Sequence, residues 1–248
     1  MKRFWLIFIL FFALLAPVHA ESSDVVQLSI QTGKAGGGIN LSTTLQILLL
    51  FTILSLLPSI LVMTTCFVRI VIVLSFLRTS LTLQQPSNQI VIGLALFLTF
   101  FIMSPVWNTI QRDAITPMQQ GKITTEQAFK AAVEPLKIFM LKQMKEKDLE
   151  LFTSLSHEPI TAKTPQELPI DVIIPSFMLA ELKAGFEMGL LVMLPFLIID
   201  LIVASILMTL GMMMLPPPVV SLPIKIMIFV LVDGWTLIVT SLVSSFAQ

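Results

Sequence analysis

The chain has 248 residues, of which 56% are hydrophobic and 12% are charged, and its formal net charge is zero. Because soluble domains usually carry about 25% charged residues, this composition and a mean hydropathy of +0.94 predict an all-α integral membrane protein. The absence of net positive charge argues against nucleic-acid binding. Cys66, His19 and His157 are the only cysteine and histidines, which excludes an intrachain disulfide and a cysteine-based or histidine-rich metal site, so no cofactor is predicted.

Residues 1–20 have the form of a secretory signal peptide. Two basic residues precede an apolar core, and Val18-His19-Ala20 is a plausible cleavage site. The alternative is an uncleaved first transmembrane helix, for which the apolar core is short. Cleavage would place the mature N-terminus on the periplasmic side. Residues 21–40 are rich in glycine and poor in large apolar groups, which predicts a flexible leader.

A first apolar helical hairpin is predicted for residues 41–107. The run Leu45–Leu77 is too long for one straight span, since about 20 residues cross a bilayer. A kink at Pro58 is therefore expected. A turn near residues 83–88 follows, and the chain returns with Trp107 as an interfacial anchor.

Residues 108–187 carry most of the charged side chains and predict a helical extramembrane segment. Loops longer than about 60 residues escape the positive-inside rule, so this segment is placed on the periplasmic side with the N-terminus. Thr124 and Gln127 form a capping box that begins an amphipathic helix, whose apolar face is expected to cover the protein's own core rather than a partner. The charges of Lys142–Glu150 are expected to be solvated, and Ser176 is a candidate cap for the next helix.

A second apolar hairpin is predicted for residues 188–248, with a turn at Gly211–Pro218. No helix is expected to pass through the three prolines, because each lacks an N–H and fixes φ. Three consecutive methionines fan over about 200° of a helix and cannot share one packing face. They suit a surface that seals and deforms, because methionine is apolar and flexible. Copper binding has little support without a nearby histidine or cysteine. The turn comprises Gly211, Met212, Met213, Met214, Leu215, Pro216, Pro217 and Pro218.

Ionisable residues interrupt the apolar runs, and such charges are costly at membrane depth. Counted from the hairpin tip along straight helices, Asp200 and Asp233 both lie about 25 Å away. Arg69 reaches a similar depth in the first hairpin. These depths predict that Arg69 pairs with Asp200 or Asp233, in this chain or in a neighbouring copy. The alternative, that both aspartates only satisfy the backbone of a neighbouring helix, stays open.

Three further charges lie at the entry to the second hairpin. Glu181, Lys183 and Glu187 are on one predicted helix. Lys183 and Glu187 are spaced i,i+4 and can pair locally. Either of these two could instead reach Lys225 of another subunit.

The chain lacks a glycine-rich phosphate loop, a Gly-x-Ser-x-Gly nucleophile elbow and a His-Glu-x-x-His zinc motif. The sequence therefore predicts no enzyme. A proton-coupled transporter of small solutes, with Asp200 and Asp233 as relay sites, is an alternative function. A purely structural assembly factor is another. Inverted repeats, which would favour a transporter, are not evident.

Several long blocks carry a family resemblance when they are taken together. They are Arg69–Arg78, Gln85–Gln89, Pro175–Lys183, Pro195–Ser205, Gly211–Pro217 and Lys225–Trp235. In these blocks the chain resembles the FliP family, membrane components of the flagellar type III protein export apparatus, and the injectisome counterparts of that family. The resemblance covers about residues 40–246.

The resemblance implies an export gate in the bacterial inner membrane, at the flagellar basal body. It implies a homo-oligomer of about five copies joined by FliQ-like and FliR-like proteins, with FlhA-like and FlhB-like proteins nearby. Unfolded flagellar substrates would pass through a central pore. Met212, Met213 and Met214 would form a gasket in that pore, and Glu181, Lys183, Glu187 and Lys225 would lie at subunit contacts. The apolar hairpins would then be bent and packed on neighbouring subunits.

Overall fold

The computed structural model describes residues 41–82, 87–155, 167–212 and 214–246, so the predicted signal peptide and leader lie outside the described residues. Every regular element within these ranges is a helix, which confirms the predicted all-α class. The chain divides into two units, residues 1–48 and 49–248. Of the first unit only the beginning of α2 is described, and the packing below concerns the second. The helices are α2 (Leu41–Met63), α3 (Phe67–Ser80), α4 (Asn88–Ile102), α5 (Ser104–Ile110), the π-helix η1 (Gln111–Ile115), α6 (Thr116–Gln119), α7 (Thr125–Gln143), α8 (Glu146–Leu155), α9 (Ile170–Thr209), α10 (Pro217–Leu231) and α11 (Gly234–Ser244).

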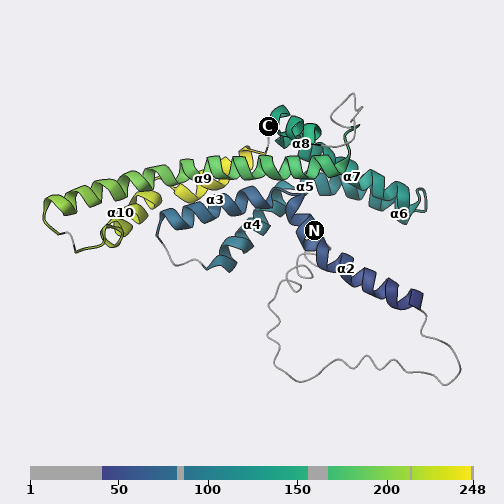
Figure 1. Ribbon diagram of the computed structural model, residues 1–248, viewed down its shortest axis with the longest axis horizontal. Coiled ribbons are helices and arrows are strands. Elements are labelled where there is room, and N and C mark those ends of the chain that lie inside the picture. Colours follow the sequence, from purple (N-terminus) through teal and green to yellow (C-terminus); the bar gives the residue numbers. More distant parts are fainter. Residues whose placement is uncertain (1–40, 83–86, 156–166, 213, 247–248) are drawn as a thin grey trace, which may run out of the picture. The chain divides into compact units, whose positions relative to one another are not determined.

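Helix α9 is the longest element and organises the second unit. It packs against α3, α7, α8 and α10 (Figure 1). Its 40 residues cross the boundary that the sequence suggested after Glu187, so the extramembrane segment and the second hairpin share one helix.

The prediction that Ser176 caps a helix is wrong. Helix α9 begins earlier, with Pro169 as N-cap, because the N–H groups of Val172 and Ile173 both donate to the Pro169 carbonyl. Ser176 lies inside the helix, where its hydroxyl donates to the carbonyl of Val172 at 2.7 Å. Pro175 removes one backbone bond but does not end the helix, since burial of Ile173 and Phe177 holds both sides of it.

The first apolar run is bent at a place that the sequence did not predict. Helix α2 passes through Pro58, and the bend of 67° between α2 and α3 follows Met63. The Thr64 hydroxyl donates to the Ile60 carbonyl at 2.9 Å, a side-chain bond that competes with the helix ladder and often bends helices. Thr64 and Cys66 are buried, so the core holds this break in place.

The last apolar run is also bent. Helices α10 and α11 meet at 64°. Between them Asp233 adopts a left-handed conformation with φ of 50°, which is uncommon for a residue with a side chain. A Cβ on Gly234 would collide with the ring of Phe229, so only glycine fits there. Asp233 therefore lies at the bend itself, at the end of α10.

Two apolar clusters hold the described helices of the second unit together. The larger joins α3, α4, α9, α10 and α11, and the smaller is centred on Met140, Ile173 and Phe177. The predicted capping box of Thr124 and Gln127 is confirmed at the start of α7. The C-terminal half of α7 covers these clusters, as expected, whereas Phe129 near its start is exposed.

Large apolar side chains also cover the outside of the described helices. Leu191, Leu201 and Leu210 of α9 are all more than half exposed. Among the described helices, α9 alone is long and apolar enough to cross a membrane, and up to four spans are possible if each bent helix pair counts as one. Such a surface requires lipid or other protein chains around it, since soluble monomers rarely expose apolar patches of this extent.

Candidate functional site

The methionine turn, residues 211–218, begins with a complete helix C-cap. Gly211 has φ of +75°, and no atom lies within 4 Å of the place where a Cβ would be. The Gly211 N–H donates to the Met208 carbonyl, and the Met212 N–H donates to the Leu207 carbonyl. These two bonds form a Schellman motif, which glycine favours because it adopts the left-handed conformation without strain.

The prolines end the turn by starting the next helix. Pro216 is the N-cap of α10, and Pro217 and Pro218 form its first turn, where a missing N–H costs no helix bond. Helix α10 therefore begins inside the predicted turn. The prolines begin this helix, but they do not end α9, which stops at Thr209 with the glycine cap described above.

One methionine of the turn, Met214, is almost completely exposed. Met214 is 99% exposed and Met212 is 43% exposed, while Met213 lies outside the described residues. An unbranched apolar side chain that contacts nothing in its own chain is available to contact another copy.

Arg69 forms the most elaborate polar contact among the described residues. Its guanidinium binds both carboxylate oxygens of Glu181, with Nε at 3.0 Å from Oε2. It also donates to Gln143 at 3.3 Å and to the hydroxyl of Ser245 at 3.1 Å, with a longer bond to the Ser245 carbonyl. The ring of Phe246 lies 3.9 Å from the guanidinium carbon. All five N–H donors of the arginine are thereby used.

The predicted pairing of Arg69 with Asp200 or Asp233 is therefore wrong within this chain. Arg69 and Glu181 are 4% and 0% exposed, and they join α3 to α9. The depth argument failed because it set the tips of the two hairpins level, whereas α9 runs on well past the end of α3. Ile72 lies against Gly185 and Phe76 lies against Gly189, so Arg69 is level with Glu181 rather than with Asp200.

Lys225 and Asp200 form a second ion pair, in which Lys225 is buried and the side chain of Asp200 is 29% exposed. The Lys225 Nζ lies 2.6 Å from Asp200 Oδ2 and 2.8 Å from the carbonyl oxygen of Ser80. The other carboxylate oxygen of Asp200 accepts a bond of 2.6 Å from the Ser221 hydroxyl. This pair joins α3, α9 and α10.

The remaining charges of the predicted set are more exposed. Lys183 pairs with Asp148 of α8 at 2.6 Å instead of with Glu187. Asp148 is buried, which corrects the expectation that the whole Lys142–Glu150 cluster is solvated. Glu187 is exposed and forms no ion pair within the described part of the chain, and Asp233 is exposed at the bend before α11.

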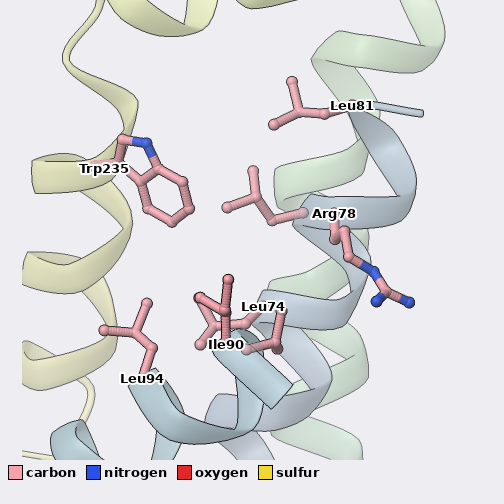
Figure 2. A pocket seen from close by; sticks show the side chains of 8 residues that line it. Leu74, Arg78, Leu81, Ile90, Leu94 and Trp235 are labelled. Carbon is pink, nitrogen blue, oxygen red and sulfur yellow. The ribbon is translucent and has the colours of Figure 1, made fainter. Parts of the chain in front are cut away.

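An apolar groove lies beside these pairs. Leucine and isoleucine side chains of α3 and α4 line one side of it, and Trp235 of α11 faces them (Figure 2). Arg78 is its only ionisable lining residue, and its guanidinium points away from the space and bonds to Asn88. The lining is therefore almost entirely apolar. Among the described residues no cluster of histidine, cysteine and carboxylate side chains could hold a metal ion.

Sequence reasoning missed several residues that complete these contacts. The local sequence around these residues gives no sign of a special role, because their partners lie far away along the chain. They are Gln143, Asp148, Ser245 and Phe246. Gly185 and Gly189 carried a usable signal, since small residues spaced i,i+4 in an apolar helix indicate close helix packing.

We expect Gly189→Ala to destabilise the chain by about 1–3 kcal/mol, because the new Cβ would lie 2.6 Å from the Phe76 ring. That ring packs edge-on against Phe186 and cannot easily move. Gly93→Ala is the matched control, since its Cβ would meet nothing within 4 Å, and it should stabilise α4 by about 0.5–1 kcal/mol. Thermal unfolding in detergent measures both. Equal melting temperatures for the two variants would contradict the close contact.

Comparison with known proteins identifies the family. The FliP family model matches residues 50–242. The flagellar biosynthetic protein FliP of Bacillus subtilis (strain 168) is 52% identical over 210 residues, covering 84% of this chain and 94% of the relative. That of Pectobacterium carotovorum is 50% identical, covering 85% and 81%. That of Aquifex aeolicus is 49% identical, covering 86% and 90%. With a family model matching most of its length and relatives of this similarity, the chain belongs to the FliP family.

Proposed function

We propose that the chain is a pore-forming subunit of the flagellar type III protein export gate. Several copies, with FliQ-like and FliR-like proteins, would surround a path through which unfolded flagellar proteins cross the bacterial inner membrane. The name of the relatives, flagellar biosynthetic protein, supports a role in flagellum assembly. FlhA-like and FlhB-like proteins would deliver the substrates.

The proposal of a pore rests on the exposure of the methionine turn. Met214 contacts nothing in its own chain, and the turn lies at the tip of a hairpin whose outer side is apolar. In a ring of about five copies, the tips would meet and place about fifteen thioethers at one constriction. A flexible apolar ring of this kind can hold back hydrated ions and still admit an extended chain of any sequence.

The two ion pairs favour the role of a rigid subunit over that of a solute transporter. Arg69 and Glu181 satisfy one another, and Asp200 is engaged by Lys225 and Ser221. The described contacts of Asp200 thus give no support to the alternative of a solute transporter. We therefore propose no transport of small solutes and assign no catalytic residue.

The placement of the chain is part of the proposal. Cleavage of the signal peptide would put the mature N-terminus and residues 108–187 on the periplasmic side. The exposed leucines of α9 would then contact lipid or neighbouring subunits. Glu187, which is exposed, is a candidate for contact with another subunit, and Lys183 has its partner on α8.

Two measurements test this function. Native mass measurement of the complex extracted in mild detergent should give several copies together with small partner proteins. Deleting the gene should abolish flagellin in the culture medium, and a plasmid copy should restore it. A monomer or dimer that supports proton-linked solute uptake, in a strain that still exports flagellin after deletion, would refute the proposal.

A further inference from the structure

The α9–α10 hairpin is fastened to the rest of the chain by a buried polar contact. Lys225 is 1% exposed, and its ammonium group binds Asp200 of α9 and the Ser80 carbonyl at the end of α3. The C-terminal carbonyls of a helix carry partial negative charge, so the end of α3 favours a cation there. One side chain of α10 thus reaches two other helices.

An aromatic contact lies one helical turn from this ion pair. Phe196 precedes Asp200 by four residues on α9, and Phe229 follows Lys225 by four residues on α10. The two rings are buried, with centroids 6.3 Å apart, and both belong to the larger apolar cluster. Phe196, Asp200, Lys225 and Phe229 therefore form a two-layer contact, which we call the hairpin anchor.

Beyond the hairpin anchor the two arms have few contacts except with each other. Helix α10 packs mainly on α9 and α11. Between residues 201 and 220 most side chains are exposed, and Val203 and Leu207 are the buried apolar ones in the described part of this stretch. The twelve residues from Asp200 to Met212 span about 18 Å of helix. The methionine turn is thus carried at the free end of an arm that is held at its base.

We propose that Lys225 is a positioning residue that acts, through the hairpin anchor, on the placement of the methionine turn. The anchor fixes the base of the arm, and residues 201–220 supply the movement that a passing chain requires. The consequence for pore sealing rests on the proposed function, whereas the anchor itself does not. Aliphatic burial alone would let α10 slide along α9, but two short hydrogen bonds from one ammonium group allow one register only.

Amide hydrogen exchange of the full chain in its purified complex tests the anchor directly. Lys225→Met keeps the length and apolar stem of the side chain but removes both bonds. Peptides covering residues 201–220 should then exchange at least tenfold faster, while peptides of α7 keep their wild-type rates. Lys183→Met is the matched control, because it removes an ion pair to α8 away from the hairpin and should leave residues 201–220 unchanged.

Further variants separate the anchor from general destabilisation. Ser221→Ala removes the bond to Asp200 and a longer one to the Pro218 carbonyl, and it should raise exchange of the arm by two- to threefold. Exchanging the charges, with Asp200→Lys and Lys225→Asp together, should fail to restore protection, since a carboxylate would face the Ser80 carbonyl. Unchanged exchange in Lys225→Met, faster exchange throughout the chain, or rescue by the exchanged pair would each overturn the proposal.

Ion leak and flagellin export in the same variants separate the two proposals. We expect Lys225→Met to leak ions at least tenfold faster than wild type. Faster exchange of the arm with no change in leak or export supports the anchor and refutes the role of the turn as a seal. If the variant leaks ions but exchange of the arm is not faster, the anchor proposal is overturned and the pore proposal stands.

Discussion

Replacing Arg69 with methionine is expected to lower the free energy of unfolding by about 3–5 kcal/mol, the usual cost of removing one member of a buried ion pair. Glu181 would be left as a fully buried carboxylate with no cation beside it. Gln143 and Ser245 would lose a partner as well, so the variant would loosen α3, α7 and the end of α11 from α9 at once. Thermal unfolding in detergent and the amount of chain in the membrane fraction measure the effect.

Three variants show which property of Arg69 matters. Arg69→Lys should recover little stability, because one ammonium group cannot reproduce a bidentate guanidinium with five donors. Arg69→Met combined with Glu181→Met should recover much of the loss, since an apolar pair of similar size needs no compensation. Lys130→Met, which removes an exposed ion pair with Glu126, should leave stability unchanged within error. A stable Arg69→Met single variant would contradict this account.

The partner of Arg69 could not be predicted from the sequence, although its importance could. A charge in an apolar run indicates a buried contact wherever its partner lies. The partner itself, Glu181, is 112 residues away. Choosing it requires knowing that α3 and α9 are parallel and that Gly185 and Gly189 set their register. Counting depth from two hairpin tips assumes that the tips are level, and this assumption fails because α9 continues well beyond the end of α3.

Local signals predicted local structure well. Helix caps act within a few residues, so the local sequence is sufficient to predict them. Examples are the capping box of Thr124 and Gln127, the glycine that ends α9 and the prolines that begin α10. A proline inside a helix misled the prediction at Pro175. It removes a single backbone bond, a cost that tertiary packing can offset. The break after Met63 depends on buried side chains, whereas the break at Asp233 has a local signal, because an Asp-Gly pair favours a turn.

Replacing Met212, Met213 and Met214 together with alanine is expected to raise the leak of small ions at least tenfold while flagellin export continues. Each substitution shortens an apolar side chain at the tip of the hairpin, so a ring of such tips would no longer exclude water and hydrated ions. Potassium efflux from energised cells and flagellin in the medium measure the two effects. The hairpin itself should stay intact, because Met214 packs against nothing in its own chain.

Leucine at the same three positions separates sealing from flexibility. Leucine keeps the apolar bulk, so the pore should remain closed to ions, but its branched side chain adapts less readily to a passing polypeptide and export should slow. Met227→Ala is the control, since Met227 is an exposed methionine of α10 away from the turn. It should change neither leak nor export. If the alanine variant conducts no more than wild type in assembled complexes, the methionines do not form the seal, and their exposure would have to serve another contact.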